Sequence, residues 1–247
     1  MILIGEAIQR IQSVYSKGVQ SKDSRLTDRH IYSAMITARG TLIKQQSNKR
    51  QNINDWIYQI IPCVELIDAP LHECINAPNN GTYILRSKDK LPKMISDIDE
   101  TLAKSITTLD GSQRFDLVEF ENTKYIKGNK FTGKKTRAYI RNSYLYITTL
   151  TKTKGVTIEG LFEDPIEVFN FPTTICGDCP DCKCKSYLDL EFPIDRDLLK
   201  TMIDMSAQEL VGIFTQMSED KNTNASDDNF VRDTFYKTNN NPSNYNG

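Results

Sequence analysis

The sequence predicts an α+β fold: a helical bundle, made of an N-terminal helical hairpin and a C-terminal helix, with an inserted antiparallel β domain and an extended C-terminal arm. Apolar residues recur at helical spacing near both ends of the chain. Short β-rich segments separated by turn residues fill the middle. No ten-residue helical segments alternate with these strands, which argues against a parallel sheet because parallel strands need long crossovers. The predicted boundaries are residues 1–50, 51–192, 193–217 and 218–247.

Residues 1–50 predict two helices that form a hairpin. Apolar side chains of the first helix keep helical spacing at Ile4, Ala7, Ile8, Ile11 and Val14. The pattern breaks at "SKGVQSKDS", and a second helix begins after Thr27, a residue type favoured at N-caps. Its apolar stripe consists of Ile31, Met35, Ala38 and Leu42.

Residues 51–192 predict a β domain with a cysteine-rich loop. The strand-like segments are "WIYQIIPCVELI", "GTYILRSK", "AKSITTLDG", "TRAYIRN", "SYLYITTL" and "GVTIEGLF". Turn signals such as "NNG", "DG" and "RNS" separate them. We therefore expect an antiparallel sheet or a small barrel.

Residues 193–217 predict a third long helix, which we expect to pack on the N-terminal pair. Asp195 is a plausible N-cap. The apolar residues at helical spacing are Leu198, Leu199, Met202, Ile203, Leu210, Ile213, Phe214 and Met217.

Residues 218–247 predict an arm rather than a domain, because so polar and asparagine-rich a segment cannot bury enough surface to offset its ordering entropy. Apolar side chains nevertheless recur in it, at Phe230, Val231, Phe235, Tyr236 and Tyr245. We expect these five side chains to bind a neighbouring subunit, and docking on the chain's own domain is the alternative.

The near-neutral net charge of -1 hides an asymmetry along the chain. Residues 1–50 contain nine Lys and Arg against three Asp and Glu, whereas residues 160–197 contain three against nine. One interpretation is that solvated faces differ in sign by accident. The other is a heterologous contact, in which the basic face of one copy meets the acidic face of the next. On the second interpretation, neighbouring subunits rather than DNA would bind Arg10, Lys17, Arg25 and Arg29.

The stretch "CGDCPDCKC" holds four of the six cysteines: Cys176, Cys179, Cys182 and Cys184. These four lie too close together to staple distant parts of the chain. All six cysteines, including Cys63 and Cys74, are therefore predicted to be reduced thiols or metal ligands rather than a disulfide framework. One short loop cannot wrap four sulfurs around zinc without strain, so we expect no metal and no cofactor. The alternative is a zinc site that Cys63, His72 or Cys74 completes, in a zinc-stabilised regulatory or nucleic-acid-binding module.

Catalytic motifs are weak throughout, and the sequence predicts that the protein is not an enzyme. Only two histidines could act as bases, and no nucleophile motif surrounds either. The segment "GNKFTGKKT" imitates a P-loop, but Lys135 occupies the position that must hold magnesium. No apolar run approaches the roughly 20 residues of a membrane helix, so we expect no membrane partner.

An ordered series of short segments resembles the neck ring proteins of crAss-like tailed bacteriophages. The series is "SKDSRLTDRHIYSAMITARGTLIKQQSNK", "WIYQIIPCVELI", "YILRSKDKLPKMI", "NSYLYI", "VTIEGLFEDPIEV" and "EFPIDRDLLKTMIDMSAQELVGIF". It covers most of residues 20–217 and includes neither the cysteine cluster nor the asparagine-rich arm.

This resemblance implies a head-to-tail adaptor: a structural virion protein that forms a dodecameric ring in the phage neck, docks under the portal protein and connects it to the tail. It implies contacts with other neck or tail ring proteins. It also implies a channel through which genomic DNA passes without specific binding, during packaging and ejection. The expected location is the virion neck, after synthesis in the cytoplasm of the bacterial host.

Overall fold

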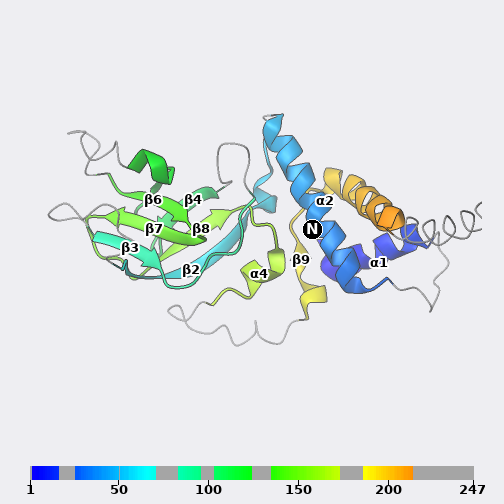
Figure 1. The fold of residues 1–247 in the computed structure, drawn as a ribbon, viewed down its shortest axis with the longest axis horizontal. Helices are drawn as coiled ribbons and strands as arrows, with labels where there is room; N and C mark the ends of the chain where they lie inside the picture. The colour runs from blue at the N-terminus through cyan, green and yellow to red at the C-terminus, as the bar shows by residue number, and fades with distance from the viewer. Residues whose placement is uncertain are drawn as a thin grey trace, which may run out of the picture.

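The computed structural model describes residues 2–16, 26–49, 51–70, 83–95, 103–123, 135–172 and 186–213. The molecule is elongated, with a β-sheet at one end and a layer of helices at the other (Figure 1).

The helices are α1 (Ile4–Tyr15), α2 (Asp28–Asn48), α4 (Pro165–Phe169) and a last helix over residues 196–213. Short 3-10 helices are η1 (Asp55–Ile57), η2 (Phe120–Asn122) and η4 (Tyr187–Asp189). The strands are β1 (Ile2–Leu3), β2 (Gln59–Asp68), β3 (Tyr83–Ser87), β4 (Ala103–Thr108), β5 (Asp116–Leu117), β6 (Arg137–Arg141), β7 (Tyr144–Thr149), β8 (Gly155–Gly160) and β9 (Glu191–Phe192).

Seven strands form one sheet in the order β4-β8-β2-β3-β7-β6-β5. The neighbours pair antiparallel except β5 and β6, which run parallel. The two edge strands, β4 and β5, follow each other in the chain and meet again across a tight turn. The Thr108 amide donates to the Gln113 oxygen and the Phe115 amide to the Ile106 oxygen, each over 2.9 Å. These bonds bring the two ends of the sheet together, so the sheet is a nearly closed barrel.

The predicted fold class, a helical bundle carrying an inserted antiparallel β domain, is wrong. The described part of the chain is mostly β: its main body is the nearly closed seven-stranded barrel, with four α-helices beside it. Long helices give a continuous periodic signal, whereas barrel closure depends on pairing between edge strands that no local pattern reveals. The helical periodicity therefore led to a prediction in which the helices, rather than the barrel, form the main body of the fold.

Turn chemistry fixes the hairpins of the barrel. Asn142 and Ser143, between β6 and β7, have positive φ values of 51° and 64°. Two such residues in succession are typical of the two-residue turn whose twist matches that of the strands. In the β4–β5 turn, Gly111 has a φ of 69°, a conformation that glycine adopts at no steric cost.

Alternating side chains of the strands fill the interior of the barrel. The fully enclosed members, each at most 2% exposed, are Ile61, Val64, Leu85, Ile106, Phe115, Ala138, Leu145, Ile147, Val156, Ile158 and Phe162. Burying an aliphatic or aromatic side chain stabilises the fold by about 1.5–3 kcal/mol, so this cluster is the main source of stability for the barrel.

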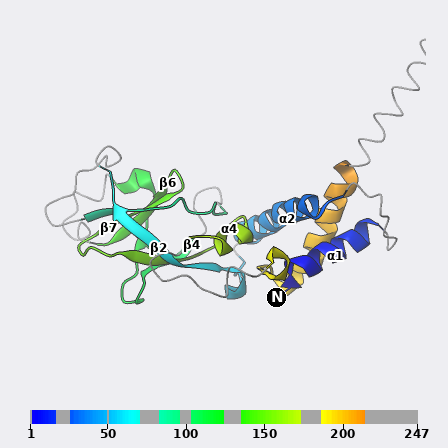
Figure 2. The same ribbon diagram turned by 90° about the horizontal axis from the view of Figure 1, so that it is seen from below.

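A second core lies in the helical layer, between α1, α2 and the helix over residues 196–213 (Figure 2). The helical spacing predicted all three helices. Ile4, Ala7, Ile8 and Ile11 are buried on one face of α1. The two-residue ribbon of β1 and β9 brings the N-terminus beside residues 191–192. A smaller cluster of Ile43, Ile57, Ile95 and Leu161 connects the end of α2 with the barrel.

Candidate functional site

A buried arginine connects the helical layer with the barrel. Arg39 of α2 is 0% exposed. Its Nη1 donates to the main-chain oxygen of Phe162 over 2.6 Å, and its Nε donates to that of Pro193 over 2.8 Å. The same guanidinium lies 5.9 Å from the centre of the Phe192 ring. One side chain thus satisfies carbonyl oxygens after β8 and before the last helix, and this fixes the relative position of the two cores.

The protonation of Arg39 follows from its surroundings. Burial lowers the pKa of its guanidinium to about 10, so the group stays charged at neutral pH. Tyr32, two turns earlier on α2, donates its hydroxyl to Asp164 Oδ1 over 2.7 Å. The same oxygen accepts from the Ile166 amide over 2.8 Å and so caps α4. Burial and the bond to Asp164 raise the pKa of Tyr32, which keeps its hydroxyl a donor.

The sequence interpretation missed Arg39 as a structural residue, although a signal for it exists. Arg39 lies four residues after Met35 and three before Leu42, so it belongs to the apolar stripe of α2. A charged residue on a stripe that otherwise faces the core indicates a buried hydrogen-bonded cation.

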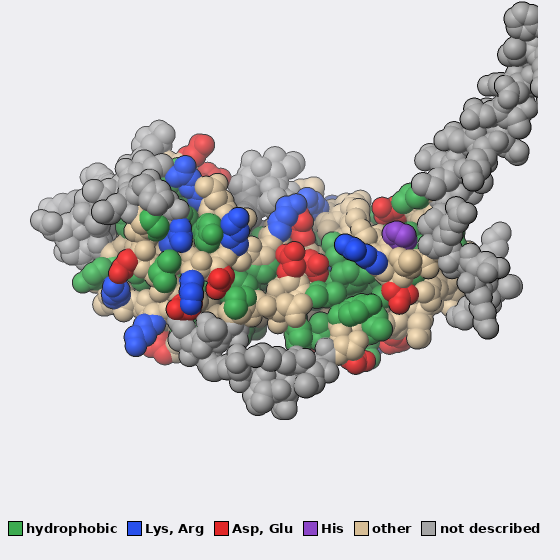
Figure 3. Space-filling model, turned by 60° about the horizontal axis from the view of Figure 1, so that its bottom comes forward, with side chains coloured by type: hydrophobic (Ala, Val, Ile, Leu, Met, Phe, Trp, Pro, Cys, Tyr) green, Lys and Arg blue, Asp and Glu red, His purple; other side chains and the backbone are tan. Residues whose placement is uncertain are grey.

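Several apolar side chains of the described chain stay exposed, both beside the barrel and in the helical layer. Trp56 of η1 is 72% exposed and Ile60 of β2 is 57% exposed. In the helical layer, Leu3 of β1, Val14 of α1 and Tyr187 of η4 are 42%, 48% and 44% exposed. Figure 3 shows hydrophobic side chains gathered on the surface of this part of the molecule. Aromatic residues on a surface are the usual anchors of protein interfaces, so both groups are candidate contacts with other subunits.

A lysine network lies next to Trp56. Lys104 Nζ is 2.8 Å from Asp55 Oδ1 and 2.9 Å from Glu159 Oε1. It also lies 4.8 Å from the centre of the Tyr58 ring. The bonds to Asp55 and Glu159 raise the pKa of Lys104, so this lysine is firmly charged and holds η1 against the sheet.

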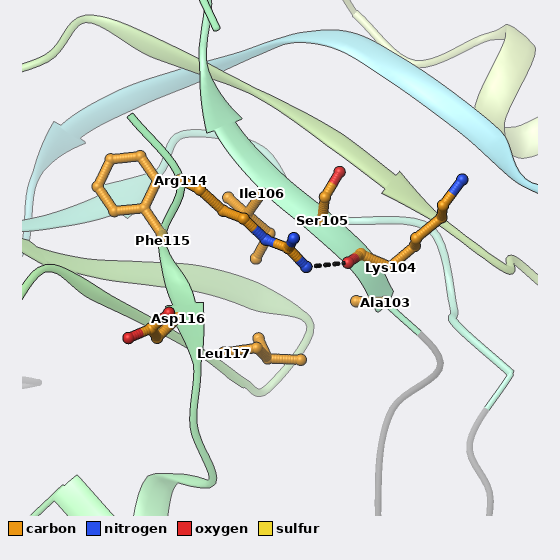
Figure 4. Close-up of a pocket in the computed structure, with 8 residues that line it drawn as sticks. All are labelled: Ala103, Lys104, Ser105, Ile106, Arg114, Phe115, Asp116 and Leu117. Atoms are coloured by element: carbon orange, nitrogen blue, oxygen red, sulfur yellow. Dashed lines mark hydrogen bonds between the residues drawn. The ribbon is translucent and has the colours of Figure 1, made fainter. Parts of the chain in front are cut away.

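The barrel has an incomplete closure between β4 and β5, which we call the seam. It is a cavity of about 500 Å³ lined by Ala103, Lys104, Ser105, Ile106, Arg114, Phe115, Asp116 and Leu117. Arg114 Nη2 donates to the main-chain oxygen of Lys104 over 2.9 Å. Figure 4 shows this side chain crossing the space between the two strands. The cavity lies within the size range of ligand pockets.

The residues predicted to bind partners fall partly within the described structure. Arg10 is exposed on α1 and pairs with Glu6 of the same helix, with a nitrogen–oxygen distance of 2.6 Å. Arg29 is exposed in the first turn of α2. Lys17 and Arg25 lie outside the described residues, as do all five arm residues: Phe230, Val231, Phe235, Tyr236 and Tyr245.

The proposed zinc ligands are also mostly outside the described residues, including Cys176, Cys179, Cys182 and Cys184. Cys63 of β2 is described: it is 1% exposed and disulfide-bonded. The expectation of a reduced thiol or metal ligand is therefore wrong for Cys63. In the described ranges, no three His, Cys, Asp or Glu side chains are grouped so that they could hold a metal ion.

None of the helices described is both long and apolar enough to cross a membrane.

Comparison with known proteins gives two matches. The family described as phage tail ring protein 2 matches residues 6–229. The chain is also 27% identical over 223 residues to Ring protein 2 of Bacteroides phage crAss001, and the alignment covers 85% of this chain and 91% of that protein. These matches confirm the resemblance to ring proteins of crAss-like phages.

Proposed function

This chain belongs to the phage tail ring protein 2 family, and we propose that it forms a ring in the phage neck that connects the portal to the tail and surrounds the DNA channel. The observation that carries this proposal is the family match, which extends over residues 6–229 and therefore includes both the helical layer and the barrel. The chain is a structural ring protein of a phage particle. Its position in the neck, its dodecameric copy number and its portal contact are parts of the proposal.

The exposed apolar groups support assembly. A ring needs a heterologous contact, in which one surface of each subunit binds a different surface of the next. The described part of the chain exposes apolar side chains in two places, at Trp56 and Ile60 and at Leu3, Val14 and Tyr187. Two unlike surfaces on one subunit are what such a contact requires.

The charge asymmetry supports the same type of contact. The basic residues Arg10 and Arg29 lie on the exposed side of α1 and α2. Exposed acidic residues of the acidic part of the chain are Glu167, Asp189 and Glu191. We propose that the basic residues, together with Lys17 and Arg25, bind neighbouring subunits. A channel wall that bound phosphates would impede DNA transit, because each neutralised phosphate adds affinity.

We propose that the protein has a structural role and does not catalyse a reaction. The side chains that line the seam lack histidine and cysteine, and its charged groups are Lys104, Arg114 and Asp116. Two of these are engaged in holding strands together, through Lys104 Nζ and Arg114 Nη2. The hydroxyl that lines the seam, Ser105 Oγ, donates to Glu159 Oε2 over 3.1 Å, and that carboxylate is already paired with Lys104, which disfavours it as a base for a nucleophile.

Reconstitution with the portal tests the proposed function. Purified chain is mixed with the portal protein of the same phage, and the particles are imaged by electron microscopy. We expect a layer of added density coaxial with the portal ring. Portal particles that remain unchanged at saturating chain concentration would contradict the neck-adaptor role. A chain with exposed polar Gln51 replaced by alanine serves as the control and should dock normally.

A further inference from the structure

We propose that the seam between β4 and β5 binds the arm segment Phe230–Tyr236 of a second copy of this chain as an added β-strand. The proposal rests on the proposed ring function, because it needs neighbouring copies. It specifies which surface of one subunit receives the arm of the next. Four observations support it. They are the incomplete hydrogen bonding between β4 and β5, the β-bulge that causes it, the amino-acid composition of the arm and the position of the last helix.

The ladder between β4 and β5 stops before the strands end. Thr107 and Arg114 are bridged, so Ile106 is opposite Phe115 and Lys104 is opposite Leu117. In a regular antiparallel ladder, the Leu117 amide would donate to the Lys104 oxygen. Instead, that oxygen accepts from Arg114 Nη2 over 2.9 Å. A side chain therefore satisfies a carbonyl that a strand would normally satisfy.

The main chain of Leu117 points toward the open seam. Its neighbour Val118 donates to the Ala138 oxygen of β6 over 2.9 Å. Since successive main-chain groups of a strand alternate in direction, Leu117 faces the other side, toward β4. Among the described residues, β4 offers it no hydrogen bond. An unpaired strand edge of this kind binds extended peptides readily.

A β-bulge explains why the strands separate here. Ala103 pairs with Gly160 and Ser105 with Glu159, so Lys104 is an extra residue in β4. Bulges bend the strand that carries them and often end its pairing. The bulge also turns the Lys104 side chain toward Asp55 and Glu159. The seam, with its cavity of about 500 Å³, is thus a consequence of the bulge and not of fraying at the end of a strand.

The arm contains a segment suited to this edge. The sequence "FVRDTFY", Phe230–Tyr236, consists mainly of aromatic and β-branched residues, which favour strands. One charge of the segment also fits this edge, because Asp233 can approach the Arg114 guanidinium that lines the seam. Charge complementarity of this kind fixes the register of a contact.

The arm is long enough to reach a neighbour. The binding segment begins 17 positions after Ile213, and this stretch can extend about 56 Å at 3.3 Å per residue. The helix over residues 196–213 lies at the end of the molecule opposite the barrel (Figure 1). The described part of the chain thus ends far from its own seam, and we take the next subunit of a ring as the acceptor.

Photo-crosslinking in the full chain tests the proposal. A benzoylphenylalanine probe replaces Ser105 in β4, and the same probe at Leu117 provides a second position if the first variant folds poorly. Chains labelled with ¹⁵N are mixed with unlabelled chains before irradiation, so that crosslinks between copies carry both isotopes. We expect crosslinks of mixed isotope that join the probe to residues 230–236. A probe at Thr148 is the matched control, because β7 pairs with β3 and β6 on both sides there.

The outcomes separate this inference from the proposed function. A ring whose seam probe crosslinks to another segment, only within one chain, or not at all would overturn the inference and leave the ring function intact. Chains that never form a ring would contradict the proposed function itself. The Phe235→Asp substitution should reduce the mixed-isotope crosslink by about tenfold, since aromatic anchors carry most of an interface. Asn240→Asp, also in the arm, should leave the crosslink unchanged.

Discussion

Arg39 Nη1 lies 2.6 Å from the main-chain oxygen of Phe162, and this hydrogen bond joins α2 of the helical layer to the last residues of the barrel. The same guanidinium also bonds Pro193, so its removal would leave two buried carbonyl oxygens without a donor. A hydrogen bond from a charged group contributes about 1.5–3 kcal/mol. Arg39 is therefore a central residue of the junction between the two cores.

The Arg39→Met substitution should destabilise the protein by about 3 kcal/mol, because it keeps the volume of the side chain but removes every donor. Urea unfolding of the full chain measures the free energy of unfolding. Lys44→Met on the same helix is the control, since Lys44 is exposed and should change stability by less than about 0.5 kcal/mol. Equal effects of the two substitutions would show that the Arg39 bonds do not hold the junction.

The Tyr32→Phe substitution should cost about 1–2 kcal/mol, because it removes the hydroxyl that donates to the Asp164 carboxylate over 2.7 Å. Loss of that donor also weakens the cap of α4. Tyr187→Phe is a matched control, since this tyrosine is 44% exposed. Thermal unfolding compares the two variants, and an unchanged midpoint for Tyr32→Phe would contradict the role assigned to this bond.

The Asp110 carboxyl should titrate near pH 2. Bonds from Thr108, Ser112 and the Ser112 amide lower its pKa to about 2. Because the folded pKa lies below the unfolded value of 3.8, its contribution to stability is present above about pH 4 and is lost as the pH falls toward 2. Carboxyl ¹³C NMR measures the titration directly. A midpoint near 4 would mean that the β4–β5 turn does not hold this carboxylate.

Removal of residues 218–247 should abolish portal binding and leave the subunit folded. The barrel and helical cores lie within the described residues before 214, so circular dichroism and the unfolding midpoint should remain close to those of the full chain. Portal binding is measured by co-sedimentation. Normal binding by the shortened chain would show that Phe230, Phe235, Tyr236 and Tyr245 are dispensable. Asn240→Ala in the full chain serves as the control and should bind.

Purified protein should contain no stoichiometric zinc. The spacing of Cys176, Cys179, Cys182 and Cys184 on a single loop disfavours tetrahedral coordination. Elemental analysis of protein purified without chelator decides this directly. One zinc per chain, lost in a variant with all four cysteines replaced by serine, would instead support the zinc-stabilised module.

Local patterns predicted the elements of the fold better than their assembly. The spacing of Ile31, Met35 and Leu42 was sufficient to predict α2, because one face of a helix must be buried. The turn at Asn142 and Ser143 marked the hairpin of β6 and β7. Strand β5, only two residues long, carries too little pattern to be recognised, and barrel closure depends on it.

The candidate sites were harder to predict, because they arise from contacts between distant parts of the chain. Arg39 and Phe162 are 123 residues apart, and no local pattern connects them. The seam requires the bulge at Lys104, which only the pairing with β8 reveals. The family resemblance, in contrast, depends on the order of several segments and was visible without the structure.

The mass of the purified protein, measured by light scattering with and without the portal protein, tests ring formation most directly. We predict a closed oligomer with a single copy number, alone or on addition of portal, and a combined particle in which the copy number matches the symmetry of the portal. A chain that remains a monomer at high concentration and does not change mass with portal would contradict the account.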